Sequence, residues 1–155
     1  MTTTQVDLLA KRTLDVLPIR GSTDAVVAGA LATDRCLAMG FPARASREVG
    51  IAAAELATNI VRHAGKGEVE IEVTEDRACL TATDDGPGID NPGAALRDRF
   101  SRGRMRADPD EPLLSLGCGL GAVERLMSSL GFESRPGGGT VVRAIKVREP
   151  NLPWW

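Results

Sequence analysis

The strict alternation of residues 68–73, EVEIEV, is the feature that most constrains how this chain can fold. Its branched apolar side chains point to one side of an extended segment and its glutamates to the other, the pattern of a half-buried antiparallel strand. The turn TED at 74–76 leads into RACLTATD at 77–84, which we expect to return as the neighbouring strand. The chain then leaves this central strand through DDGPGI at 84–89. The sheet therefore leads two carboxylates directly into a bend of glycine and proline.

The segments before residue 68 read as one strand and two helices. Residues 14–20, LDVLPIR, predict a short strand, and the proline within it indicates a sheet edge. Residues 22–24, STD, offer an N-cap and an acidic first turn, and Gly40 is a natural stop for the helix that follows. We expect the apolar face of this helix to consist of Val26, Val27, Ala30, Leu31, Leu37 and Ala38. A second helix is predicted over 43–64, with Val49, Ala53, Leu56 and Ile60 as its buried stripe.

The segments after residue 90 contain a long excursion and the last elements of the fold. Residues 92–116 are rich in Arg, Asp, Gly and Pro, and such long excursions are usually functional. A helix with a glycine-rich start is predicted over 117–131, a short strand near 132–135 and a final strand over 140–147. The order of elements predicts an α+β fold, a two-layer sandwich with helices on one face of a mostly antiparallel sheet. We expect residues 1–13 to be loosely ordered, 14–148 to form the domain and 149–155, with both tryptophans, to form a tail.

Composition excludes several classes of function. The net charge of −2 favours neither nucleic acid nor an anionic membrane as a partner, and an aromatic content of 3% argues against stacking of single-stranded bases. The three cysteines are far apart, which fits neither a disulfide framework nor a C-x-x-C metal site and suits a reducing compartment. The N-terminus lacks the pattern of a signal peptide, and no apolar run is long enough to cross a bilayer. We therefore expect a cytoplasmic protein.

Four stretches carry the chemistry that the pattern suggests. Glu55 and Asn59 lie one turn apart on the second helix, and a carboxylate with an amide at this spacing suits a hard cation such as Mg²⁺, although a solvated helix face is the simpler interpretation. DDGPGI alone reads as a β-turn, but its carboxylate could also accept a hydrogen bond from an exocyclic amine, with glycines that let a flat ring approach. LGCGLG at 116–121 opens a helix, where bare backbone N–H groups bind phosphate. GGGT at 137–140 places a hydroxyl at the start of the last strand.

Together these stretches resemble the GHKL superfamily of ATPases and kinases. ELATNIVRHAGKG is similar to its N box, DDGPGI to its G1 box, SLGCGLGAVERLM to its G2 box and GGGT to its last box, in the right order. Within the superfamily, GLGAVERLM and the lack of a dimerisation helix hairpin are most similar to the anti-sigma-factor serine/threonine kinases, in particular the RsbT-type switch kinases. The resemblance implies the Bergerat (GHKL) fold, with a mobile ATP lid over the excursion.

The resemblance also implies a role for each matched position. Asn59 would bind Mg²⁺ that bridges the phosphates of ATP, and Glu55 would polarise the attacking hydroxyl or a water. Asp84 would bind the adenine amine. The other nucleotide contacts would come from Gly86, Gly88 and Ile89 at the base, from Thr140 through its hydroxyl, and from Gly117, Gly119, Leu120 and Gly121 at the phosphates. Ser115 departs from the family pattern, in which the G2 box often begins with glycine.

The resemblance extends to the lid and to partners. Five arginines crowd the excursion, and Arg102 or Arg104 would reach the γ-phosphate when the lid closes. A solvated basic loop, or a surface for an acidic partner, is the alternative interpretation of these arginines. An RsbT-type kinase would phosphorylate Ser or Thr on a STAS-domain antagonist or stressosome scaffold, similar to RsbS or RsbR, and the freed kinase could then bind a PP2C-type phosphatase regulator similar to RsbU. Two alternatives remain open at this point: an RsbW-like anti-sigma factor that sequesters a sigma factor, and a regulatory module that holds ATP without turnover.

Overall fold

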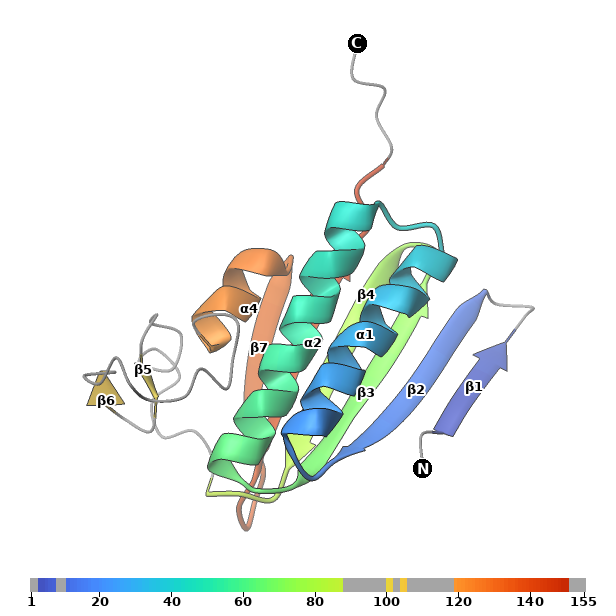
Figure 1. Ribbon diagram of the computed structural model, residues 1–155. Coiled ribbons are helices and arrows are strands. Elements are labelled where there is room, and N and C mark those ends of the chain that lie inside the picture. Colours follow the sequence, from blue (N-terminus) through green and yellow to red (C-terminus); the bar gives the residue numbers. More distant parts are fainter. Residues whose placement is uncertain (1–2, 8–10, 88–99, 102–103, 106–118, 151–155) are drawn as a thin grey trace.

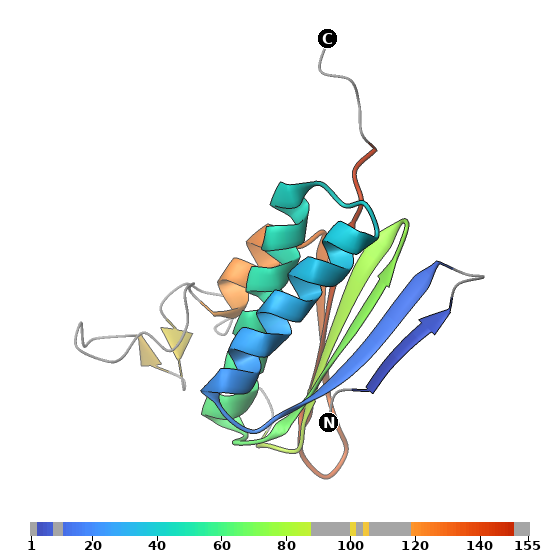
Figure 2. The same ribbon diagram turned by 45° about the vertical axis from the view of Figure 1, so that its right-hand side comes forward.

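The computed structural model describes residues 3–7, 11–87, 100–101, 104–105 and 119–150. Within them, six strands form one sheet in the order β1-β2-β3-β4-β8-β7, with every neighbouring pair antiparallel. Helices α1, α2 and α4 cover one face of this sheet, and no described element covers the other (Figures 1 and 2). The predicted α+β sandwich is confirmed.

The sheet is built around the hairpin that the alternating pattern predicts. Strand β3 (Gly67–Thr74) buries its branched residues, and β4 (Arg77–Asp84) returns beside it. Strand β8 (Thr140–Val147) flanks β4 on its other side and matches the predicted final strand. Strand β2 (Arg12–Ile19) lies between β1 and β3 and pairs with both. The prediction that this strand lies at a sheet edge is therefore wrong, because β1 adds a further strand outside it.

Two expectations about order along the chain are wrong. Residues 1–13 were expected to be loose, but Thr3–Asp7 form strand β1 and β2 begins at Arg12. The backbone of β1 gains a partner from β2, which the polar composition of this segment does not reveal. The helix expected over 117–131 is α4 (Leu120–Leu126), and Ser129–Ser134 form β7 against β8. Leu130 and Phe132 of β7 pack against the core, and the burial of these side chains favours a strand at 129–134 over a continuation of helix α4.

Helices α1 (Ser22–Ala38) and α2 (Ala43–His63) pack along each other (Figure 1). The predicted stripe of α2 is buried as expected. The predicted face of α1 is wrong, because the helix buries the small residues Ala25, Ala28, Ala32 and Cys36 and exposes Val26, Val27 and Leu37. The N-cap is Gly21, one residue before the predicted cap, and the carboxylate of Asp24 accepts hydrogen bonds from the backbone N–H groups of Arg20 and Gly21. Gly40, with φ +83°, ends α1 as predicted.

The two helices approach closely where each has a glycine. A Cβ added to Gly29 would lie 3.0 Å from the carbonyl oxygen of Gly50, and one added to Gly50 would overlap the hydroxyl of Thr33. The Thr33 hydroxyl is already used, because it donates to the carbonyl of Gly29 at 2.9 Å. The small residues therefore set the separation of α1 and α2.

The excursion between β4 and α4 lies largely outside the described residues. Within it, β5 (Phe100–Ser101) and β6 (Arg104–Met105) pair as a short antiparallel ribbon. The expected mobility of an ATP lid here stays a prediction, as do the domain boundaries at 14–148 and the tail at 149–155.

Candidate functional site

The carboxylate at the end of β4 is held by its own turn. Asp84 is half-buried, and its Oδ1 accepts a hydrogen bond from the backbone N–H of Gly86 at 2.8 Å. This local bond fixes the side chain and leaves Oδ2 for a second donor. In the register of β4 and β8, Asp84 lies opposite Thr140, whose side chain is 3% exposed. The two residues predicted to contact the base therefore lie side by side.

The glycines behind Asp84 join three segments. The backbone N–H of Gly139 donates to the carbonyl of Gly86 at 2.6 Å, which ties the GGGT turn to the DDGPGI bend. A Cβ added to Gly86 would lie 2.7 Å from the Cβ of Ala64, the C-cap residue of α2. We expect Gly86 to let a flat ring approach the backbone. The structure shows another reason why a residue without a side chain is needed at this position, namely the close approach of α2. Ala64 and Gly139 are the contributors that sequence reasoning missed.

Asp85, to which the sequence assigns no role, lies on the outer surface of the same turn and pairs with Arg135. Its Oδ1 lies 2.7 Å from Nη1 of Arg135, and its side chain is 80% exposed. An exposed ion pair of this kind adds little stability, because water competes for both charges. Asp85 therefore makes a surface contact, while Asp84 turns towards the interior.

The N-box residues lie on the half of α2 that approaches this corner. Glu55 is 2% exposed, Asn59 is half-buried, and their spacing of four residues places them on one side of the helix. The Nδ2 atom of Asn59 is buried and has no hydrogen-bond partner among the described residues. A buried N–H donor that lacks a partner fits a site completed by a ligand with acceptor oxygen atoms, such as a phosphate. His63 ends the helix and is exposed.

The phosphate-binding segment is described only from residue 119 onward. Gly119 caps α4 with a φ of +70°, a conformation that glycine adopts without strain, and Leu120 and Gly121 are buried in the first turn. The N–H groups of Ala122 and Val123 already donate to the carbonyl of Gly119, which leaves those of Leu120 and Gly121 for an anion. Helix α4 lies beside α2, on the side away from α1 (Figure 1).

Several predicted contacts fall outside what the structure describes. Gly88, Ile89, Arg102 and Gly117 lie outside the described residues. Arg104 is the first residue of β6, but its side chain is not described. The structure thus brings Asp84, Thr140 and Gly86 together, with α2 against them and α4 beside α2, and the remaining assignments stay predictions.

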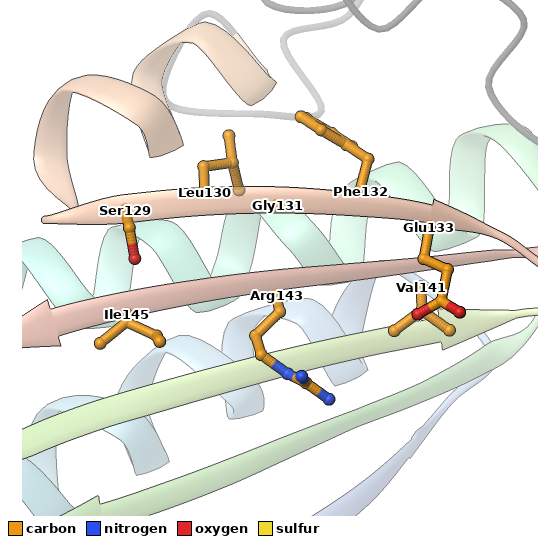
Figure 3. Close-up of a pocket in the computed structure, with 8 residues that line it drawn as sticks. All are labelled: Ser129, Leu130, Gly131, Phe132, Glu133, Val141, Arg143 and Ile145. Carbon is orange, nitrogen blue, oxygen red and sulfur yellow. The ribbon is translucent and has the colours of Figure 1, made fainter.

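Three further observations concern the part of the chain that the structure describes. Among the described residues, no three His, Cys, Asp or Glu side chains lie together as a metal cage. A shallow hollow lies elsewhere, over β7 and β8 (Figure 3). Arg143 and Ile145 extend from β8 into it, while Leu130 and Phe132 extend to the opposite side of β7. None of the described α helices is long and apolar enough to span a membrane.

Comparison with known proteins identifies the family. Residues 21–146 match the histidine kinase-like ATPase domain. The chain belongs to this family. The predicted membership of the GHKL superfamily is therefore confirmed, and the family match includes α1, α2 and the last strand, β8. A relative, the serine/threonine-protein kinase RsbT of Bacillus subtilis (strain 168), is 35% identical over 127 residues, which are 79% of this chain and 88% of that protein.

Proposed function

We propose that this chain is a serine/threonine protein kinase that binds Mg-ATP and transfers the γ-phosphate to a Ser or Thr of a STAS-domain protein. The similarity to a serine/threonine-protein kinase over most of both chains supports the activity. The observation that carries the proposal is the placement of a buried carboxylate, Glu55, one turn from Asn59, whose buried Nδ2 lacks a hydrogen-bond partner among the described residues, on the helix that abuts the Asp84 turn. A site that only held nucleotide would not need both.

Each described residue has a distinct task in this proposal. Asp84 accepts a hydrogen bond from the adenine amine through Oδ2, since Oδ1 is used by Gly86. Asn59 would hold Mg²⁺ through its amide oxygen, and the bound ion would supply positive charge that offsets the charge of the phosphates. Glu55 accepts the proton of the attacking hydroxyl, and its burial keeps water from competing for that proton. The N–H groups at the start of α4 bind phosphate oxygens, and the lid arginines add positive charge.

The choice of a STAS-domain substrate rests on the resemblance to RsbT-type switch kinases. Phosphorylation adds about −1.5 to −2 charge to the acceptor surface, which would break a docking interface by repulsion or desolvation. The released kinase would then bind a second partner, such as a PP2C-type phosphatase regulator. Partner exchange driven by phosphorylation is the signalling role that we propose.

Calorimetry of nucleotide binding tests the base pocket. We expect Asp84→Asn to lose at least tenfold in affinity for Mg-ATP, because a hydrogen bond to a charged acceptor contributes about 1.5–3 kcal/mol. Asp85→Asn is the matched control, since this neighbouring carboxylate meets only Arg135 in the described chain. Equal affinity of both variants and the wild type would contradict the assignment of Asp84.

Phosphoryl transfer to a purified STAS-domain protein tests the catalytic assignment. We expect Glu55→Gln to bind Mg-ATP normally and to transfer phosphate about 10²–10⁴-fold more slowly, which is the usual contribution of a general base. Asn59→Ala should lose both binding and transfer. Undiminished transfer by Glu55→Gln would remove Glu55 from the chemistry, and nucleotide binding by a wild type that phosphorylates no STAS protein would favour the regulatory module.

A further inference from the structure

The outer face of α1 is apolar although it faces solvent. The large apolar side chains that are exposed in the described residues are Val26, Val27, Leu37, Ile51 and Val147, and all but Val147 lie on α1 or α2. Val26 is 70% exposed, and the other three on the helices are 39–47% exposed. On α1, Val26, Ala30 and Leu37 follow at helical spacing and form a stripe opposite the buried one.

The stripe of α1 continues onto α2 across the glycine seam. Ile51 follows Gly50, whose carbonyl lies close to Gly29 of α1, so its exposed side chain stands beside the outer face of α1. The line of contact between α1 and α2 offers few polar groups. Gly29 and Gly50 bring the helices close together there, and the Thr33 hydroxyl is already bonded within α1. We call the surface of Val26, Val27, Ala30, Leu37 and Ile51 the outer helix patch.

The charges at the margins of the patch are few and of opposite sign. Asp34 is exposed on the outer side of α1, three residues before Leu37, and Arg47 is exposed on α2, one turn before Ile51. Neither forms a hydrogen bond or salt bridge within the part of the chain that the structure describes. The neighbouring arginines are engaged, since Arg35 holds Asp15 at 2.7 Å and Arg44 holds Glu48 at 2.9 Å.

We infer that the outer helix patch is a self-association surface, occupied by the same patch of a second copy of this chain. An isologous contact requires a surface that complements itself about a two-fold axis. An apolar centre with one acid on the α1 margin and one base on the α2 margin meets this requirement, because the axis places each Asp34 against the partner's Arg47. The contact covers apolar side chains that α1 otherwise leaves in water, and it gives Asp34 and Arg47 opposite charges across the axis, where one copy offers neither a hydrogen bond nor a salt bridge among its described residues.

This surface is distinct from the proposed nucleotide site. Asp84, Thr140 and the start of α4 lie elsewhere, and α4 packs on the side of α2 away from α1 (Figure 1). Two joined copies would therefore keep both nucleotide sites accessible. The inference does not rest on the kinase activity, since it uses only the exposure and charge of the helix layer.

Sedimentation equilibrium on the full chain without nucleotide tests the inference. We expect the wild type to show a monomer–dimer equilibrium and Val26→Glu to raise the dissociation constant at least tenfold, because the new charge would be desolvated at the centre of the contact. Val147→Glu is the matched control, since Val147 is 53% exposed and lies outside the patch, at the end of β8. Thermal unfolding verifies that both variants stay folded, as substitution at exposed positions permits.

Charge exchange supplies the decisive comparison. Asp34→Arg and Arg47→Asp should each weaken the dimer, because each single change places like charges opposite one another. The double variant, which restores opposite charges across the axis, should return the dissociation constant to within a few-fold of the wild type. A wild type that stays monomeric would overturn the inference, even if Val26→Glu impaired binding of some other protein. So would a dimer weakened equally by Val147→Glu, or no recovery in the double variant.

Discussion

Two structural requirements favour glycine at position 139, one of backbone conformation and one of space, and the sequence alone does not distinguish them. Its φ of +97° lies where a side chain is strained, and a Cβ there would overlap the carbonyl oxygen of Asp84. Its N–H also holds the DDGPGI bend through Gly86. The glycine therefore fixes the position of the predicted base-binding turn, and its role depends on backbone contact more than on flexibility.

Alanine substitutions in this turn distinguish steric overlap from backbone strain. Gly137→Ala should cost about 1–2 kcal/mol of unfolding free energy, because Gly137 has a φ of +85° but its Cβ would meet nothing within 4 Å. Gly139→Ala should cost at least about 1 kcal/mol more, because the carbonyl of Asp84 must also move. Urea unfolding of both variants measures the difference. Equal losses of unfolding free energy in the two variants would mean that the backbone at Asp84 can move away from the new side chain without a loss of stability.

Among the elements, those with a single unambiguous period were predictable from sequence. The alternation in β3 and the apolar stripe of α2 each leave one face that can be buried, and the structure buries it. Helix α1 carries two stripes of similar period, one of Ala and Cys and one of Val and Leu. Sequence rules favour the bulkier stripe, but the close approach at Gly29 and Gly50 suits the smaller one. The separation of two helices is a tertiary property, which periodicity does not encode.

In the candidate site too, residues marked by a local sequence pattern were predictable, and residues that act through tertiary contacts were not. The four boxes indicate Asp84, Thr140, Glu55 and Asn59 because each requires a particular residue type, and the structure places the first two as cross-strand neighbours. Gly139 and Ala64 lie within two of the four boxes, but their roles depend on contacts between segments far apart in the chain, which the boxes do not reveal. The end of α4 was missed for a similar reason, since pairing with β8 turns Ser129–Ser134 into a strand.

Lys146 joins three elements of the helix layer and the sheet. From β8 its Nζ donates to Oε2 of Glu48 on α2 at 2.6 Å and to the carbonyl of Leu126, the last residue of α4, at 2.7 Å. Burial alone would raise the pKa of Glu48, but hydrogen bonds from Lys146 and Arg44 outweigh it, and the pKa is lowered from its ordinary value of 4.5. This junction fixes one end of α4, whose other end is the predicted phosphate site.

The pH dependence of stability tests this junction. A lowered pKa means that the native state favours the ionised carboxylate, so its contribution is present above about pH 4.5 and is lost as the pH falls through the native pKa. Glu48→Gln should therefore cost about 1.5–3 kcal/mol at pH 7 and progressively less towards pH 3. Glu75→Gln is the control at pH 7, where removal of its exposed pair with Lys11 should cost at most about 0.5 kcal/mol. Urea unfolding across this pH range measures both, and a cost of Glu48→Gln that is constant with pH would contradict the junction.

At the scale of the whole molecule, the proposed site spans both layers. It takes Asp84 and Thr140 from the centre of the sheet, Glu55 and Asn59 from α2, and the first turn of α4. A ligand that binds residues from all these elements binds tightly only to the state in which the two layers are assembled. Its binding energy should therefore appear in global unfolding, not in the fraying of one element.

Ligand-dependent unfolding measures this coupling. Mg-ATP at about 100 times its dissociation constant should raise the unfolding free energy by about 2.7 kcal/mol, which for a chain of 155 residues raises the midpoint of thermal unfolding by several degrees, roughly 5–10 °C. Asp84→Asn at the same nucleotide concentration should lose most of this rise, because its weaker binding leaves less free energy to couple. Asp85→Asn should keep it, since its exposed carboxylate faces Arg135. If Mg-ATP bound the wild type in calorimetry but left the unfolding midpoint unchanged, the nucleotide would have comparable affinity for the unfolded chain, and a site assembled from the sheet, α2 and α4 would be ruled out.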